Sequence, residues 1–593
     1  MVASEKCQYK NEEYDFKCDE PPRDADNKFC IFQDIGYLKG NNYEIHKEEV
    51  ANRFQEKIVE YSSEGMPWCF IGYCLPAVSF QNYEFTDAFS FNAAIFYGNA
   101  NFYEAILSGD ARFTGATFYK DAMFSGATFS SYLTMFSGAT FSKGAGFTGA
   151  IFSGDARFTG ATFYKDARFT GATFSGDADF RRANFEGKAS FVRATFSNEA
   201  GFDKATFSEA NFFEATFSNV ATFIGTTFSN EAGFKAADFD KATFSNVASF
   251  DQATFSNMAS FAYTKFLNVT SFNSAAFSDE SNFAATTFND VSFSQTRFSE
   301  EANFRNVAFV NEAEFTSTTF CSGADFGRSI FSNAAYFSAI FKSETFFNYV
   351  RFENQNKIIF ESEDMSKVSF INTDITRIRF SDKIAWGGKD KFTVIEEKWL
   401  EDSSKNIEER RRVSLGGILS VYRNLRENYE FRLQFDEAGK FFIREMELRK
   451  YRQIAPVSSS SDFTIKKNGP FRRNIFSLIG WYHILSNYGE SLWRPTAAGF
   501  LIVFSFTFFF VTQNNPALIP SFYTVFSNSS VIHSGTNNAT HSSTNNTKDA
   551  VVAAKPDTNY SKFVGLERVG NPTQWQKAFE RDMGDFSSSN SAK

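Results

Sequence analysis

Three cysteines near the start of the chain have the residue type and the spacing of a small structural metal site. Cys7, Cys18 and Cys30 all fall within the first 75 residues. Structural zinc sites hold a tetrahedral ion with four Cys or His side chains, and binding of the ion adds to the folding energy. The spacing therefore predicts a zinc site at these three residues, with a fourth ligand still to be identified.

No second group of residues suggests chemistry. The four histidines are scattered among different segments, so spacing does not bring a nucleophile, a base and an orienting group together. The sequence contains no glycine-rich loop with a Lys-Ser or Lys-Thr pair that would cradle a phosphate. We therefore expect a protein that is not an enzyme.

Composition narrows the class of protein further. Six cysteines are too few for a disulfide scaffold, and residues 1–75 contain no positively charged start followed by an apolar run. We therefore expect the N-terminus to stay in the cytoplasm. The formal net charge of −9 argues against nonspecific binding to nucleic acid, which needs clustered Lys and Arg.

A repeat dominates the part of the chain against which the three cysteines must be positioned. From about Phe80 to Phe380, a phenylalanine returns every five or six residues, usually with an alanine two positions before it. The steps often alternate, as at Phe158, Phe163 and Phe169, so the true period is eleven. A helix would repeat its apolar face at three and four residues, and a strand at two. The pattern instead predicts small units that bury their apolar faces by stacking on one another.

A coiling backbone explains this spacing. If each unit forms one side of a four-sided turn, a turn takes about 22 residues, and turns stack at the strand spacing of about 4.8 Å. Phe158, Phe180 and Phe202 would then stack as inward-facing rings, and the small alanines would leave room for them. Roughly 13 or 14 turns would give a rod about 65 Å long.

These units resemble the pentapeptide-repeat family, whose units read A-x-F/L-x-x and whose fold is a right-handed quadrilateral β-helix. The resemblance covers residues 76–395, and the fold class that it implies is mainly β. Lapses interrupt the spacing at the seven-residue step from Phe129 to Phe136 and at five-residue steps over 207–217 and 234–244. We expect these lapses to be bulges or register adjusters.

Residues 1–75 are expected to cap the open end of this solenoid with a helix over 48–61, because an exposed turn presents unpaired backbone. The segment C-I-F-Q at residues 30–33 is similar to one that reads C-I-F-H in membrane-attached archaeal and bacterial relatives. Gln33 takes the place of that histidine, and glutamine is a poor zinc ligand. Three alternatives follow: the site is degenerate and lost, His46 completes it, or a water does.

Outward positions of the coil carry mixed polar and charged residues. Residues 22 apart share a face, so Asp155, Asp177 and Glu199 would form a short acidic ladder, with Asp166 and Lys188 on the opposite side. The ladder is either an ordinary solvated face or part of a DNA-like surface, which some pentapeptide-repeat proteins are thought to present to DNA gyrase. It is only three charges long, which favours the solvated face.

Beyond Phe380 the composition turns helical, and residues 396–455 are expected to form a hairpin of helices over 414–430 and 436–453. This pair is similar to helices that follow the repeats in the membrane-attached relatives, and it also resembles one tetratricopeptide-like unit. We expect it to cap the solenoid, the alternative being a surface for a partner. The composition of residues 456–495 predicts a linker and an aromatic, interfacial amphipathic segment.

An uncharged run over residues 496–513 is rich in Phe, Leu, Ile and Val. Its length of about 25 Å is near the lower limit for crossing a bilayer, and the alternative is a buried core helix. Lys and Arg precede the run and none follows until Lys548, which predicts a single-pass protein with a cytoplasmic rod and a tail outside. The tail, residues 514–593, is polar and is expected to be largely disordered.

Together these features predict a membrane-tethered scaffold for an unknown protein partner, with nucleic acid not expected as a partner and structural zinc as the candidate cofactor. One alternative is an acidic mimic of DNA that binds an enzyme such as gyrase. The other is a regulatory or pore-less relative of the two-helix ion channels that the membrane-attached relatives resemble. No T-x-G-Y-G filter follows the membrane run, so the sequence lacks the carbonyl-lined potassium site.

Overall fold

The computed structural model describes residues 6–24, 27–64, 68–229, 236–401, 415–454, 478–489, 491 and 493–514. The chain divides into two compact units, which we describe separately. The first comprises Met1–Lys467 with Ala578–Lys593, and the second comprises Asn468–Lys577. The repeats and the three N-terminal cysteines belong to the first unit, and the uncharged run belongs to the second.

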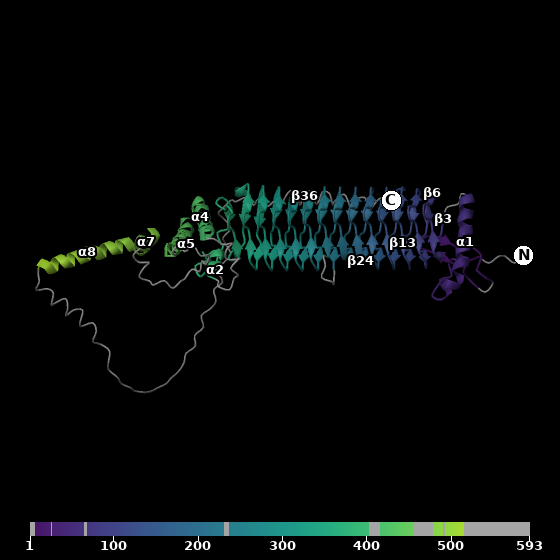
Figure 1. Cartoon of the computed structure of the whole chain (residues 1–593), viewed down its shortest axis with the longest axis horizontal. Helices are drawn as coiled ribbons and strands as arrows, with labels where there is room; N and C mark the ends of the chain where they lie inside the picture. The colour runs from purple at the N-terminus through teal and green to yellow at the C-terminus, as the bar shows by residue number, and fades with distance from the viewer. Residues whose placement is uncertain are drawn as a thin grey trace, which may run out of the picture. The chain divides into compact units, whose positions relative to one another are not determined.

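A parallel β-solenoid of about 14 turns forms most of the first unit (Figure 1). Its strands run from β3 (Trp68–Cys69) to β53 (Arg379–Phe380), and most of them are two residues long. They form two sheets of 26 and 25 strands, and successive pairs of strands alternate between the sheets. Each turn therefore has four short strands, as the spacing predicts. The right-handed sense and the square section stay predictions.

One turn illustrates the register. β6 (Glu84–Phe85) and β7 (Phe89–Ser90) lie in the first sheet, and β8 (Ile95–Phe96) and β9 (Ala100–Asn101) lie in the second. The next strand, β10 (Ile106–Leu107), returns to the first sheet and pairs in parallel with β6. Main-chain groups of each turn are thus satisfied by the turns before and after it, which allows strands this short to persist.

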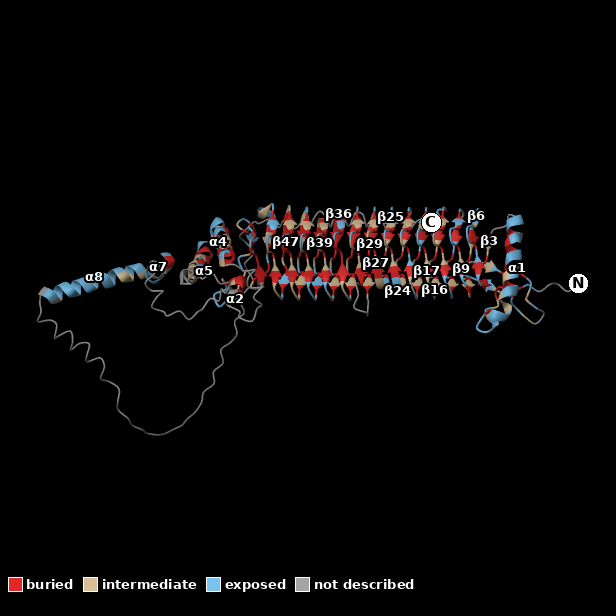
Figure 2. Cartoon of the chain, viewed as in Figure 1, coloured by how far each residue is buried: buried red, intermediate tan, exposed pale blue. Residues whose placement is uncertain are grey.

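Stacked phenylalanine rings fill the solenoid. Phe158 stacks on Phe180 with ring centroids 4.8 Å apart, and Phe180 stacks on Phe202 at 5.0 Å, as predicted. Rings of neighbouring columns meet edge to face, as Phe147 and Phe158 do at 5.5 Å and 88°. All these rings are completely buried. Figure 2 shows that buried residues run along the whole solenoid. The stacking distance equals the spacing of paired strands, so the backbone repeat sets the separation of the rings.

In the C-terminal half of the solenoid, threonine often replaces the inward alanine. Oγ1 of Thr226 donates to the carbonyl of Phe202 at 2.8 Å, and Oγ1 of Thr286 donates to that of Phe261 at 2.7 Å. A buried hydroxyl without an acceptor would cost free energy, and these carbonyls remove that cost. The same contact recurs at Thr264, Thr296, Thr318 and Ser329.

The lapses in spacing change the length of a turn without breaking the columns of rings. The step that ends at Phe136 makes one turn a residue longer, because Ala111 pairs with Thr134, whose buried side chain takes the alanine position. The five-residue steps over 207–217 make a turn a residue shorter. Ring stacking continues across both changes, so these lapses are register adjusters, as predicted. Part of the run over 234–244 lies outside the described residues.

An N-terminal cap lies over the first turn of the solenoid (Figure 1). A short antiparallel hairpin of β1 (Lys10–Asn11) and β2 (Phe16–Lys17) precedes helix α1 (Asn42–Glu64), which is longer at both ends than the predicted helix. Phe54 of α1 contacts the ring of Phe70 in the first turn, with centroids 5.0 Å apart. The apolar face of α1 thus covers the first rings of the column.

Among the described residues, three helices follow the last turn: α2 (Ile395–Glu401), α4 (Leu415–Phe431) and α5 (Phe435–Ile454). α4 and α5 form the predicted hairpin, at the end of the solenoid opposite to α1 (Figure 1). Trp386, which is buried beneath the hairpin, donates from Nε1 to the hydroxyl of Tyr429 in α4 at 3.2 Å.

Side chains of these helices satisfy main-chain groups at the open end of the solenoid. Nδ2 of Asn428 donates to the carbonyls of Ile375 and Ile378 at 2.7 and 2.8 Å. The carboxylate of Glu396 in α2 accepts from the main-chain N–H of Phe370 at 3.0 Å. An uncapped turn would leave such groups free to pair with another chain. These contacts favour the predicted capping role over a surface for a partner.

In the second unit, α7 (Leu478–Ser486) and the 3₁₀ helix η2 (Asn487–Gly489) precede α8 (Trp493–Asn514). The stretch Trp493–Val511 of α8 is long and apolar enough to cross a membrane, and none of it is buried. α8 begins earlier than the predicted run because Pro495 is tolerated in the first turn of a helix, where N–H groups have no intrahelical acceptor.

Only part of the predicted organisation around α8 falls within the described residues. α7 belongs to the predicted interfacial segment and exposes Trp481 and Tyr482. Residues 456–477, which make up most of the predicted linker, and residues 515–593, which make up the predicted tail, lie outside the described residues.

Candidate metal centre

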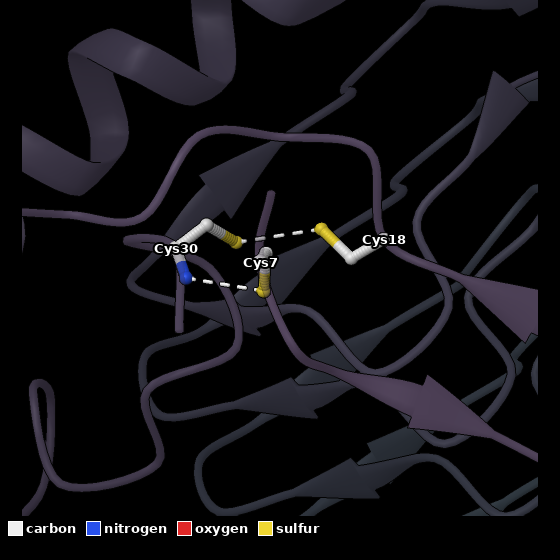
Figure 3. Close-up of side chains that lie close together, drawn as sticks. All are labelled: Cys7, Cys18 and Cys30. Atoms are coloured by element: carbon white, nitrogen blue, oxygen red, sulfur yellow. Dashed lines mark hydrogen bonds between the residues drawn. The ribbon is translucent and has the colours of Figure 1, made fainter. Parts of the chain in front are cut away.

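The three predicted cysteines come together at the base of the N-terminal hairpin (Figure 3). Cys7 precedes β1 and Cys18 follows β2, and the main-chain N–H of Cys18 donates to the carbonyl of Tyr9 at 3.1 Å. Cys30 arrives from the loop before α1. All three thiols are buried, and their Sγ atoms lie within 4.8 Å of one another. Strand pairing in the hairpin therefore positions two of the three sulfurs.

The spacing of the sulfurs fits a tetrahedral ion. The Sγ atoms of Cys18 and Cys30 are 3.7 Å apart. Two Zn–S bonds of about 2.3 Å at the tetrahedral angle would place their sulfurs about 3.8 Å apart. A disulfide needs about 2.05 Å, and all three residues are free thiols in the structure. The three cysteines can hold a metal ion without rearrangement of these two sulfurs.

Local interactions favour the protonated thiols of Cys7 and Cys18. Burial raises the pKa of Cys7, and the hydrogen bond with Cys30, together with burial, raises the pKa of Cys18. Metals bind the thiolate form, so an incoming ion must displace these protons. Binding of a metal here would therefore weaken as the pH falls.

Gln33, and not His46, lies beside the thiols. Oε1 of Gln33 is 3.7 Å from Sγ of Cys7 and also contacts Sγ of Cys30. His46 instead stacks on Tyr37, with ring centroids 3.9 Å apart. The likeness of residues 30–33 to the segment C-I-F-H marked position 33, although the ligands expected to complete the site were His46 or a water.

A buried ion pair ties the loop of the cysteines to α1. Nζ of Lys57 is 2.6 Å from a carboxylate oxygen of Glu20, and both side chains are almost completely buried. Removal of either partner would leave an uncompensated buried charge. Sequence reasoning missed this pair, because the two residues are distant in the chain and belong to no repeated pattern.

On the surface of the solenoid, the predicted acidic ladder is present. Asp155, Asp177 and Glu199 follow one another along the first sheet, and Asp166 and Lys188 lie along the second. Burial and the charge of Asp155 raise the pKa of Asp177, and burial and the charge of Asp177 raise the pKa of Glu199. These like charges therefore repel one another across successive turns.

Asparagines continue this ladder toward the C-terminal end. Nδ2 of Asn219 donates to Oδ1 of Asn198 at 2.9 Å, and Asn246 donates to Asn219 at the same distance. The series begins where Asn198 donates to Asp177, and it extends to Asn268. Because amides are neutral, the surface is not a continuous acidic stripe. Sequence reasoning missed these asparagines, although three of them stand in the same segment, T-F-S-N.

Comparison with known proteins identifies the repeat. A family model described as pentapeptide repeats (9 copies) matches residues 77–117, 91–135 and 136–183. No curated protein and no solved structure matches the chain. Parallel pairing in the same register continues from the matched residues to β53. Residues 77–183 therefore carry pentapeptide repeats, and the β-solenoid that contains them continues to β53.

Proposed function

We propose that this protein is a non-enzymatic scaffold, which a single helix tethers to a membrane and whose solenoid binds a protein partner. β-Solenoids of the pentapeptide-repeat family are generally non-enzymatic and suit protein interaction. The observation that carries the tether is the exposed apolar surface of α8, over Trp493–Val511. The partner is a protein that contacts side chains along several turns of the solenoid.

Water is a poor environment for α8. Phe504, Phe506 and Phe510 are 67%, 71% and 69% exposed. Burial of each such side chain would contribute about 1.5–3 kcal/mol. A bilayer provides this burial, since the 19 residues of the apolar stretch extend about 28 Å and the hydrocarbon core is about 30 Å thick.

The distribution of charge supports a cytoplasmic solenoid. Eight Lys and Arg lie between Arg449 and Arg494, and none lies between residues 495 and 547. Cytoplasmic flanks of membrane helices carry the excess of Lys and Arg. The N-terminal side of α8 is therefore the cytoplasmic side in this proposal, and the polar tail is outside.

The solenoid supplies a regular surface for a partner. Thr173, Thr195, Thr216 and Thr243 lie next to one another on successive turns of the first sheet, where their side chains are partly exposed. Main-chain groups within the sheets are already paired, so a partner must bind side chains rather than add a strand. Such a surface, repeated over several turns, suits recognition of a folded protein.

Neither alternative function gains support from the described residues. The acidic ladder is three residues long and continues as neutral asparagines, whereas a mimic of DNA needs a longer run of negative charge. Among the described residues, α8 is the one candidate for a membrane span, whereas a two-helix channel needs two.

Fractionation of cells that express the full chain tests the tether. The native protein should remain with membranes after alkaline carbonate extraction. Replacement of both Phe504 and Phe506 by lysine should release it, because each charge at the centre of a membrane helix costs about 2.5–3.5 kcal/mol. Replacement of the same two residues by leucine is the matched control and should leave the protein in the membrane. Release of the native chain, or retention of the lysine variant, would contradict the tether.

Cross-linking in intact cells followed by purification tests the scaffold. We expect one protein to be recovered in proportion to the native chain and to be lost when Thr195 and Thr216, on the first sheet, become glutamate. The matched control places glutamate at Thr206 and Thr227, on the second sheet. Loss with the second pair alone would assign the partner to the other sheet. Failure to recover any protein in proportion to the chain would contradict the scaffold.

A further inference from the structure

The side chain of Gln33 is held with its oxygen toward the three thiols. Gln33 is buried, and its Nε2 donates to the carbonyl of Ile71 at 3.4 Å. A carbonyl can only accept, so the amide nitrogen must face Ile71 and the amide oxygen must face the sulfurs. Oε1 accordingly lies against Cys7 and Cys30. The contact with the main chain thus fixes which atom Gln33 offers to the site.

A main-chain donor lies beside the sulfurs. The N–H of Cys30 donates to Sγ of Cys7 at 3.2 Å. Such donors stabilise the negative charge of a thiolate and are typical of the groups that orient metal ligands. The thiols of Cys7 and Cys30 donate to Oε1 of Gln33 in the metal-free chain. Three thiolates and this oxygen would all be acceptors, so a cation would take the place of the thiol protons among them.

Two edges match those of one tetrahedron, whereas the closer contact between Sγ of Cys30 and Oε1 of Gln33 would have to lengthen when an ion binds. Bonds of about 2.3 Å to sulfur and about 2.1 Å to oxygen place those two atoms about 3.6 Å apart. The observed separation between Sγ of Cys7 and Oε1 of Gln33 is 3.7 Å, and that between the sulfurs of Cys18 and Cys30 is also 3.7 Å. We propose that Cys7, Cys18 and Cys30 bind Zn²⁺ as thiolates and that Oε1 of Gln33 is the fourth ligand.

This ligand set joins the cap to the solenoid. Gln33 reaches Ile71, which lies in the first turn between β3 and β4 (Cys74–Leu75). Its neighbour Phe32 stacks on Tyr73 of the same turn, with centroids 4.4 Å apart. An ion bound by Gln33 and by the cysteines would therefore lock the hairpin loop onto the first turn. Binding of zinc and closure of the cap should be coupled.

Zinc binding to the purified full-length chain in detergent tests this ligand set. Affinity is measured by competition with a chromophoric chelator, and Co²⁺ serves as a spectroscopic probe for thiolate ligands. We expect one zinc per chain, lost in Cys18→Ser and retained in Cys321→Ser, a matched control on the solenoid. Gln33→Ala should weaken zinc binding about tenfold, and Gln33→His should strengthen it about tenfold, because imidazole suits zinc better than an amide oxygen does.

The Gln33 variants keep the test decisive even if Cys18→Ser does not fold. Unchanged affinity in both Gln33 variants would overturn the assignment, as would loss of zinc in His46→Ala with no change in Gln33→Ala. A chain that binds no zinc, or binds only Cu⁺, would also overturn it. Limited proteolysis completes the test: removal of zinc should expose residues 6–64 to cleavage, and unchanged cleavage would contradict the coupling to the cap.

Discussion

Phenylalanine dominates two regions of this protein and is exposed to opposite degrees in them. In the solenoid, Phe158 and Phe180 are completely buried and stack with centroids 4.8 Å apart. In α8, Phe504 and Phe510 are 67% and 69% exposed. Alternating steps of five and six direct the rings of the repeat inward, whereas consecutive aromatic residues point to all sides of a helix. Spacing, rather than residue type, therefore separates a self-contained core from a surface that requires an apolar surrounding.

Loss of one ring should affect the two regions very differently. Phe180→Ala should lower the free energy of unfolding of the solenoid by about 3–5 kcal/mol, because it opens a cavity that touches six other rings of the column and its neighbours. Phe510→Ala in α8 is the matched control and should leave that free energy unchanged. Denaturant unfolding in detergent, followed by circular dichroism, measures both. Equal effects of the two substitutions on the free energy of unfolding would contradict the contrast between the solenoid and α8.

The solenoid buries its own apolar surface between its ends, whereas each end must be covered by another element. Glu396 lies at the C-terminal end and allows a test of how that end is covered. Its carboxylate accepts from Ser369 and Phe370, and burial raises the pKa of Glu396 to about 7. The folded state then binds a proton that the unfolded state releases, so stability should fall as the pH rises from about 4.5 to about 7. Glu396→Gln should reduce the change in the free energy of unfolding over this pH range by roughly 1–3 kcal/mol.

Thermal unfolding of the native chain and of Glu396→Gln at pH 5 and at pH 8 measures this difference. We expect the two proteins to have similar stability at pH 5, and the variant to be the more stable at pH 8. An identical pH dependence in both proteins would show that Glu396 does not titrate in the folded state.

The ring columns could be predicted from the sequence because one residue type recurs at one place in every turn. The meeting of Cys7, Cys18 and Cys30 followed from residue type and spacing. The likeness to C-I-F-H marked position 33, but the approach of the Gln33 oxygen to the thiols could not be predicted, since it depends on how an irregular loop packs against the first turn of the solenoid. The asparagine ladder also escaped prediction, because it requires knowledge of the register between turns of unequal length.

Inward and outward hydroxyls provide a finer test of the solenoid interior. Thr286 is completely buried and donates to a carbonyl, whereas its neighbour Thr287 is partly exposed. Thr286→Val should lower the free energy of unfolding by about 1 kcal/mol, the net value of one buried hydrogen bond. Thr287→Val is the matched control and should change it by less than about 0.5 kcal/mol. A larger loss at Thr287 would mean that the interior hydroxyls do not stabilise the C-terminal half.

Charge on the outside of the solenoid should have the smallest effect. The pKa of Asp177 is raised by burial and by Asp155, so ionisation of Asp177 opposes folding. Asp177→Asn keeps the acceptor for Asn198 and should stabilise the chain at pH 7 by less than about 1 kcal/mol. The gain should disappear at acidic pH, where Asp177 of the native chain is protonated. Thermal unfolding at both pH values measures it, and a less stable variant at pH 7 would contradict this reading of the ladder.

Photocrosslinking to lipids tests the contrast between the two phenylalanine-rich regions most directly. The full-length chain is reconstituted into vesicles that contain a lipid with a photoreactive group deep in its acyl chain, and crosslinked peptides are identified by mass spectrometry. We expect crosslinks within 496–511 and none within the solenoid, residues 68–380. Crosslinks to solenoid peptides, or a lipid-free α8, would contradict the account of a self-contained rod held at a membrane by one helix.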